Sequence, residues 1–311
     1  MLTMFQILLC FFFCPADGFC ALLFTETFED SNFVSRGWYD DTNLQLSAIE
    51  HIPGSAHSVE YHFLQGTKTP AVSGGSIRRK FTETDSVYIG FYVKHSANWV
   101  GSNQPYHPHE IFFLTNLDSD YWGPSVSHLT AYVEENSGYP VLLIQDTINI
   151  DQNNIGKDLT TVTEQRATAG CNGSTNDGYD FLDCYGSSGS YRNEKKWKPS
   201  SQYFRDSPGS YYKGDWHHVE AYFKLNSIVN GKGVANGILQ YWFDGILIID
   251  HKDVIIRTGQ YPNMKFNQLL IAPYIGDGSP IDQTIWIDNL TVATARPDGT
   301  IPAQPKNLRI Q

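Results

Sequence analysis

The residues with the clearest chemical potential lie in one alternating stretch, WHHVEAYFKLN, at positions 216–226. A period of two puts alternate side chains on opposite faces of a β-strand, so we expect Val219, Ala221 and Phe223 to face a core. The other face carries imidazole, carboxylate, phenol, ammonium and amide groups, from His218, Glu220, Tyr222, Lys224 and Asn226. Such groups transfer protons and bind anions, and a solvated strand does not need so many of them. We therefore predict a functional surface here.

Lys224 stands out on this face because a charge in mid-strand, between apolar neighbours, needs a reason. The alternative is that its stem packs along a sheet edge while the ammonium group reaches water. Tyr222 shares its face, and His218 is either part of the same surface or one of a surface pair at the start of the strand.

A second alternating run follows at 238–243, where Gln240 and Trp242 share one face. It ends at Asp244-Gly245, a dipeptide typical of tight hairpin turns, and another strand begins at 246. We predict a β-hairpin that adds Gln240 and Trp242 to the surface of the preceding strand.

Two further candidates come from the first half of the chain. His107 and His109 stand two residues apart, so on a strand they face the same way and could flank a substrate or bind a metal. Arg78 lies in a short strand with Arg79 and Lys80, where its charge either meets a ligand or protects a sheet edge.

Aromatic side chains make up 14% of the sequence, which favours strands and, where the rings are exposed, platforms for sugar rings. Trp99, Trp216 and Trp242 are the candidate platforms. For Trp216 and Trp242 the alternative is a core position, where a tryptophan at such a strand site is more often found.

Short alternating runs separated by turn residues recur along the chain, and no amphipathic helical run of useful length interrupts them. This pattern predicts an all-β fold, an antiparallel β-sandwich of jelly-roll type. The predicted strands lie near 24–33, 59–63, 77–81, 87–95, 109–115, 128–134, 141–145, 216–226, 238–243, 246–250, 253–257, 267–274 and 284–293.

The domain organisation follows from composition. Residues 1–21 resemble a secretory signal, with an apolar run at 8–13 and small residues after it, so we expect a secreted, extracellular protein. Residues 22–295 form the jelly-roll domain, and 296–311, with three prolines, form a tail or linker. We expect no membrane span in the mature chain, and the net charge of −11 disfavours nucleic acid as a partner.

A long segment at 146–213 has little periodicity and is rich in Gly, Ser, Asn and Asp, which indicates a large loop or insertion. Cys171 and Cys184 flank its centre. In an oxidising compartment we expect a disulfide between them that staples this loop.

The stretch GDWHHVEAYFKLNS, followed by NGILQYWFDG, resembles a pattern of jelly-roll polysaccharide lyases that act on alginate and glucuronan, within the concanavalin A-like lectin/glucanase superfamily. The residues that carry the resemblance are Gly214, Trp216, Lys224, Asn226, Gly237, Trp242, Asp244 and Gly245. Non-catalytic modules share this pattern, so it speaks for the fold more than for an activity.

The resemblance implies β-elimination on a uronate-containing polysaccharide. Such a reaction needs a cation or amide to neutralise the sugar carboxylate, a base to take the C5 proton, and an acid for the leaving oxygen. The implied catalytic residues are Lys224, Tyr222, His109 and Arg78. The implied substrate-binding residues are Trp99, His107, Trp216, His218, Asn226, Gln240 and Trp242.

Two other hypotheses are compatible with the sequence: a non-catalytic carbohydrate-binding or adhesion module, and a structural extracellular assembly protein. The sequence departs from one alginate lyase family, because it has no Gln-Ile-His strand. It also lacks the Glu-x-Asp-x-Glu run of laminarinase-type glucanases, and the adjacent Glu134 and Glu135 should point to opposite faces. A retaining glycosidase is therefore disfavoured.

The two ends, FTETFED and TIWIDNLTV, resemble the first and last strands of carbohydrate-binding jelly rolls. In such modules acidic residues from both strands often hold a structural Ca²⁺. The candidate ligands by position are Glu26, Glu29, Asp30 and Asp288. The alternative is that these acids cap a sheet edge.

Overall fold

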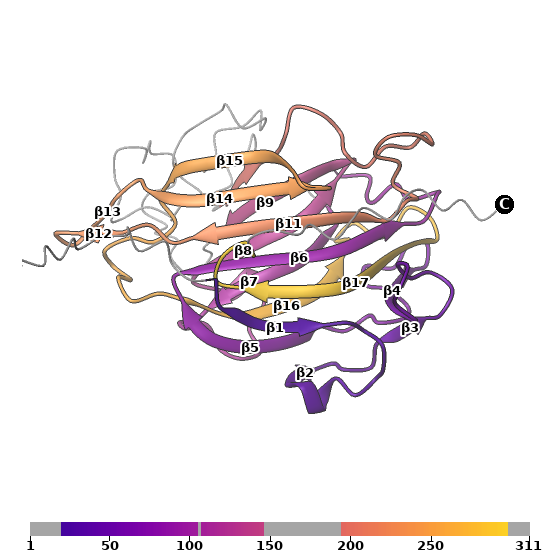
Figure 1. The fold of residues 1–311 in the computed structure, drawn as a ribbon, viewed down its shortest axis with the longest axis horizontal. Helices are drawn as coiled ribbons and strands as arrows, with labels where there is room; N and C mark the ends of the chain where they lie inside the picture. Colours follow the sequence, from indigo (N-terminus) through magenta and orange to yellow (C-terminus); the bar gives the residue numbers. More distant parts are fainter. Residues whose placement is uncertain (1–19, 105–106, 146–193, 298–311) are drawn as a thin grey trace, which may run out of the picture.

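Residues 20–104, 107–145 and 194–297 are described by the computed structural model, and they form two antiparallel β-sheets packed face to face (Figure 1). Sheet A has the strand order β15-β14-β11-β6-β17-β4-β3, and β1 also pairs with β17. Sheet B has the order β10-β9-β8-β7-β16-β5-β2. The predicted antiparallel β-sandwich is thereby confirmed.

The strands of sheet A are β1 (Leu22–Glu26), β3 (Gln45–Ser47), β4 (Ser58–Phe63), β6 (Ser86–His95), β11 (His217–Lys224), β14 (Gly237–Phe243), β15 (Ile246–Val254) and β17 (Gln283–Ala293). Those of sheet B are β2 (Trp38–Asp40), β5 (Ile77–Thr84), β7 (His109–Thr115), β8 (Thr130–Asn136), β9 (Tyr139–Gln145), β10 (Glu194–Trp197) and β16 (Phe266–Tyr274). A ribbon of β12 (Ile228–Val229) and β13 (Lys232–Gly233) and the 3-10 turns η1 (Val34–Arg36) and η2 (Pro124–Val126) complete the elements.

The alternation in the sequence decides which side chains enter the core. On β11, Val219, Ala221 and Phe223 are almost fully buried and join the core between the sheets. Phe223 meets the opposite sheet directly, because its ring centroid lies 6.4 Å from that of Phe113 on β7. His218, Glu220, Tyr222 and Lys224, on the other parity of β11, therefore point away from sheet B, onto the outer face of sheet A.

The predicted hairpin is also present. Phe243 pairs with Ile246, and Asp244 and Gly245 form the turn with φ values of 48° and 79°. Two successive residues with positive φ define the tight turn that matches the twist of the flanking strands, which is why Gly suits the second position.

The structure differs from the predicted strands at several places. Strand β15 runs on from Ile246 to Val254, where two separate strands were expected, and the short strands β3 and β10 were not predicted. The two ends of the domain meet, because β1 pairs with β17 in antiparallel register.

Several predictions lie outside the described residues: most of the signal at 1–21, Cys171, Cys184 and most of the segment at 146–213. Within the parts of the chain that the structure does describe, no helix is long and apolar enough to cross a membrane.

Candidate functional site

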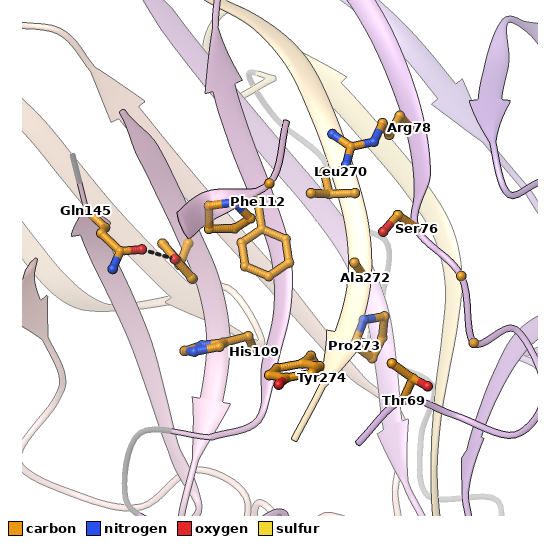
Figure 2. A pocket seen from close by; sticks show the side chains of 15 residues that line it. Thr69, Ser76, Arg78, His109, Phe112, Gln145, Leu270, Ala272, Pro273 and Tyr274 are labelled. Carbon is orange, nitrogen blue, oxygen red and sulfur yellow. Dashed lines mark hydrogen bonds between the residues drawn. The ribbon is translucent and has the colours of Figure 1, made fainter. Parts of the chain in front are cut away.

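The outer face of sheet B carries a cavity of about 460 Å³ (Figure 2). Its apolar lining includes Phe112, Tyr132 and Leu270, which belong to a second buried cluster on the outer side of the sheet. The rim near Ser76 comes from the start of β5, and Tyr274 comes from the end of β16. An apolar floor with a few convergent polar groups is the usual form of a ligand site.

His109 is the ionisable group that β7 places in this cavity. Its Nδ1 lies 2.8 Å from Oε2 of Glu134, which is buried on the neighbouring strand β8. A carboxylate at Nδ1 favours the tautomer with the proton on that nitrogen. Nε2 has no hydrogen-bond partner among the described residues, so this nitrogen is available as a base.

Tyr132 lies beside His109 on β8, with ring centroids 5.2 Å apart. Its hydroxyl donates a hydrogen bond to Oε1 of Gln145, the last residue of β9 (Figure 2). Because Oε1 accepts this bond, the amide nitrogen of Gln145 is left to donate elsewhere. The register of β7, β8 and β9 thus brings a base, a phenol and an amide to one place.

Arg78 lines the same cavity from β5, on the side away from Gln145 (Figure 2). Its guanidinium group is buried and already engaged. Nε lies 2.7 Å from a carboxylate oxygen of Asp40, and Nη1 donates to the backbone carbonyl of Trp122 and to Gln268. Arg78 therefore holds the 119–124 loop at the rim of the cavity, and it is less free to bind a ligand than a solvent-exposed arginine.

His107 lies just before β7, and its ring contacts that of His109 at a centroid distance of 4.9 Å. Its Nδ1 is 3.0 Å from Oδ1 of Asp277. Burial and the neighbouring His109 lower the pKa of His107, which favours its neutral form at physiological pH. His107 and His109 are thus neighbours, as their spacing predicts, but each has a different carboxylate partner.

The other predicted catalytic residues lie on the opposite side of the sandwich. Tyr222 and Lys224 are on the outer face of sheet A, where Tyr222 is half-buried and Lys224 is exposed. The structure therefore brings Arg78 and His109 together on one sheet and separates both from Tyr222 and Lys224.

Other side chains on the outer face of sheet A contact one another. Glu220 accepts hydrogen bonds from the hydroxyl of Tyr88 and from the guanidinium of Arg296, which also lies 4.6 Å from the ring centroid of Trp242. His218 is buried beside Tyr92, with ring centroids 4.8 Å apart, and burial lowers its pKa. These contacts engage Glu220, whereas Nδ1 of His218 has no hydrogen-bond partner among the described residues, and His218 lines a second cavity of about 510 Å³.

The other residues predicted to bind substrate lie elsewhere in the fold and do not line this cavity. Trp99 is buried, stacks on His95 and donates to Glu135. Asn226 is fully buried and bonds the backbone at 256–257, while Gln240 donates to Asp250. Trp216 is half-buried just before β11.

The four acids proposed for Ca²⁺ separate into two pairs. Ser55 Oγ donates to Glu29 and lies 3.3 Å from Asp288, so these two carboxylates share one hydroxyl. Glu26 and Asp30 instead both bond the guanidinium of Arg36. Burial and the charge of Glu29 raise the pKa of Asp288 to about 6. Of the four acids, Glu29 and Asp288 are the two that share the Ser55 hydroxyl.

Sequence reasoning did not single out Tyr132, Glu134 as a partner of His109, or Gln145. Alternation along 128–134 does put Tyr132 and Glu134 on one face, and it correctly separates Glu134 from Glu135. The missing information was the pairing of β7 with β8 and of β8 with β9, because alternation within a strand does not identify its neighbours.

No protein-family model matches the sequence, and no curated protein matches it. The fold does match solved structures. A marine PL-14 alginate lyase from Aplysia kurodai aligns with a TM-score of 0.54 at 12% identity, over 88% of this chain and 99% of the lyase. An alginate lyase from Chlorella virus gives 0.52 at 12% identity, over 88% and 100% of the two chains.

A mutant of the alginate lyase Aly36B, solved in complex with an alginate trisaccharide, gives a TM-score of 0.50 at 13% identity, over 89% of this chain and 99% of that one. At such low identity the likeness concerns the fold alone. The chain is therefore a β-sandwich jelly roll similar in fold to alginate lyases, as the sequence resemblance implied.

Proposed function

We propose that the protein acts on a uronate-containing polysaccharide by β-elimination, in the cavity on the outer face of sheet B. The observation that carries this proposal is the arrangement of His109 on Glu134, with Nε2 unbonded, beside the paired Tyr132 and Gln145. The alginate-lyase fold supports it, because those proteins act on a polyuronate.

The three groups supply the three needs of the reaction. The amide nitrogen of Gln145 donates to the uronate carboxylate, which makes the C5 proton more acidic. Nε2 of His109 takes that proton, the C5–H electron pair forms the C4–C5 double bond, and the C4–O bond breaks. The hydroxyl of Tyr132 gives its proton to the leaving oxygen, and Glu134 stabilises the imidazolium that has formed.

The test is turnover of a panel of uronate polymers, followed by the ultraviolet absorbance of the unsaturated product. We expect one polymer to be cleaved, and we expect His109→Ala to lower kcat by about 10²–10⁴-fold, the range for loss of a positioned base. His251→Ala, in β15 of the other sheet, is the matched control and should leave kcat unchanged. An active protein whose kcat is insensitive to His109→Ala would refute the assignment of the base.

The engaged state of Arg78 favours a second candidate, a glycan-binding module without turnover. Arg78 is the one Arg or Lys among the described residues that line the cavity, and Asp40 and Gln268 already bind its guanidinium. A lectin needs no free cation, whereas a lyase benefits from one. Polymer binding measured by calorimetry, with no product absorbance, would establish this alternative.

We also propose that the protein is secreted and that it binds a structural calcium ion. Residues 1–21 would direct secretion, and Cys171 and Cys184 would then form their disulfide outside the cell. Glu29 and Asp288 would hold a structural Ca²⁺, which would neutralise the two acids where the 52–56 loop meets β17.

A further inference from the structure

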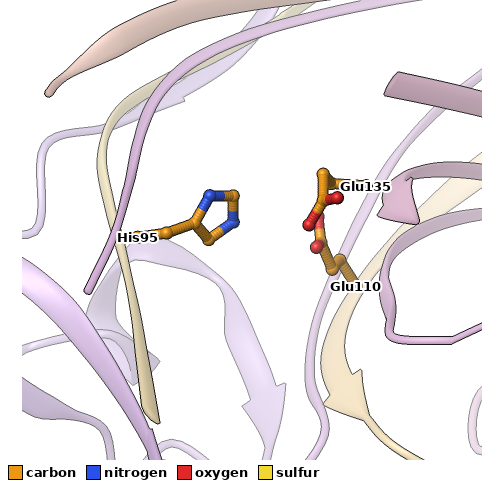
Figure 3. Close-up of side chains that lie close together, drawn as sticks. All are labelled: His95, Glu110 and Glu135. Carbon is orange, nitrogen blue, oxygen red and sulfur yellow. The ribbon is translucent and has the colours of Figure 1, made fainter. Parts of the chain in front are cut away.

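Three ionisable side chains meet inside the sandwich, beneath the cavity of sheet B (Figure 3). His95 ends β6 on sheet A, while Glu110 on β7 and Glu135 on β8 project from sheet B. Potential ligand atoms of the three residues lie within 4.8 Å of one another. The cluster is distinct from the candidate site, because the outward-facing neighbours His109 and Glu134 belong to that site and these three face the core.

His95 is fully buried, and neither of its ring nitrogens has a hydrogen-bond partner in the described part of the chain. Aromatic packing fixes the ring: it stacks on Trp99 at 4.8 Å and meets Phe204 edge-on at 4.8 Å. Figure 3 shows one ring nitrogen facing the two glutamates. A buried, oriented imidazole without a partner needs an explanation, because such groups are costly.

Glu110 and Glu135 add a second unexplained feature. Oε1 of Glu110 also lacks a hydrogen-bond partner within the described ranges, and both side chains are buried. Glu135 accepts hydrogen bonds from the indole nitrogen of Trp99 and the backbone of Gly138, yet each carboxylate oxygen keeps a second lone pair. Because both carboxylates are buried and their oxygens lie close together, two charged glutamates here require a cation.

A buried lysine near the cluster, Lys213, acts on Glu135 by its charge but is hydrogen-bonded to other groups. Its ammonium group bonds the carboxylate of Asp206 and the backbone carbonyl of Trp99. A divalent ion would balance the two glutamates, and the unbonded imidazole nitrogen would complete its protein ligands.

We propose that His95, Glu110 and Glu135 form a buried structural site for a divalent transition-metal ion, best suited to Zn²⁺. An imidazole with two carboxylates suits zinc, whereas Ca²⁺ and Mg²⁺ prefer all-oxygen sites. Ligand atoms about 2 Å from one zinc ion lie about 3–4 Å apart, so a small rotation of either glutamate closes the remaining gap.

The site lies between the two sheets, where a bound ion has a structural role. It joins the end of β6 in sheet A to β7 and β8 in sheet B, directly behind the strands that carry His109 and Glu134. A metal ion there would clamp the two sheets together and fix the strands that carry the proposed base. This structural role does not depend on whether the cavity is catalytic.

The experiment uses the full chain, stripped with a chelator and then titrated with Zn²⁺ alone. We expect about one zinc ion per chain by elemental analysis, together with a rise in melting temperature. Glu110→Gln keeps the shape of the side chain and removes an anionic ligand, so it should weaken zinc binding by at least about tenfold. Glu83→Gln, an exposed carboxylate on β5, is the matched control and should bind zinc like the wild type.

The rival explanation is a metal-free cluster that holds protons, in which Glu110 is already neutral. It predicts no zinc retained by the wild type and little effect of Glu110→Gln on melting temperature, and either result would overturn the proposal. Zinc binding that survives Glu110→Gln unchanged would place the ion elsewhere and overturn it too. If Glu110→Gln fails to fold, Co²⁺ is added to the metal-free wild type and its visible spectrum is recorded. Absorption bands of a low-symmetry nitrogen-oxygen site support the proposal, and the spectrum of hexaaqua cobalt refutes it.

Discussion

The outer faces of the two sheets differ in what their polar side chains do. On sheet A, Glu220 accepts hydrogen bonds from Tyr88 and Arg296, and Arg296 packs on Trp242, while Nδ1 of His218 has no hydrogen-bond partner in the described part of the chain. On sheet B, the outer nitrogen of His109 and the amide nitrogen of Gln145 have no partner among the described residues and line a cavity. A row of polar groups is thus a weak sign of function until their partners are known.

The comparison also separates two kinds of carboxylate. Glu220 on sheet A neutralises an arginine, which is a structural task. Glu134 on sheet B is buried and orients a histidine whose Nε2 has no partner in the part of the chain that the structure describes, which is the arrangement of a general base. Each of the following variants tests whether chemistry belongs to sheet B and stability to sheet A.

The largest difference is expected between two tyrosines. Tyr132→Phe removes the hydroxyl in the sheet B cavity and should lower kcat by about 10²–10⁴-fold, the range for loss of a proton donor. Tyr222→Phe and Lys224→Ala alter the sheet A face and should leave kcat within about twofold. Initial rates on the preferred polymer measure both, and the reverse order of effects would place the reaction on sheet A.

The next effect concerns stability where β17 of sheet A meets the 52–56 loop. If Glu29 and Asp288 hold Ca²⁺, a concentration 100 times the dissociation constant should stabilise the wild type by about 2.7 kcal/mol. Asp288→Asn should abolish this gain without changing kcat, and Asp30→Asn, whose carboxylate lies on Arg36, should preserve it. Melting curves with Ca²⁺ and with a chelator measure the gain; equal curves for the wild type would exclude the calcium site.

The smallest effect is expected from Glu134→Gln. The amide can still accept the hydrogen bond from His109, but it no longer stabilises the imidazolium by charge, so kcat should fall about tenfold with little change in KM. Steady-state kinetics separate the two parameters. A loss that fell wholly on KM would indicate that Glu134 supports binding and that His109 is not the base.

Local sequence pattern was enough to predict the strands and the direction of their side chains. The alternation of β11 correctly assigned Phe223 to the core and Lys224 to an outer face. The Asp244-Gly245 turn was predicted from its dipeptide, and Glu134 and Glu135 do point to opposite sides. These properties depend on neighbours within one or two residues, which the sequence contains directly.

Local sequence pattern predicted only part of the candidate site. His109 and Arg78 were predicted, and both line the cavity, but Lys224 was assigned to the same surface although it lies on the other sheet. The assignment of each strand to a sheet depends on pairings between strands far apart in the chain, such as β7 with β16. No local pattern contains that information.

By itself, therefore, the sequence determined an all-β sandwich and the inward or outward direction of its side chains, because side-chain alternation and turn chemistry are local. The tertiary structure alone decided which strands share an outer face. It also decided that Glu134 meets His109, and that His95 reaches Glu110 and Glu135 across the core. Those meetings come from long-range strand register and from the packing of one sheet on the other.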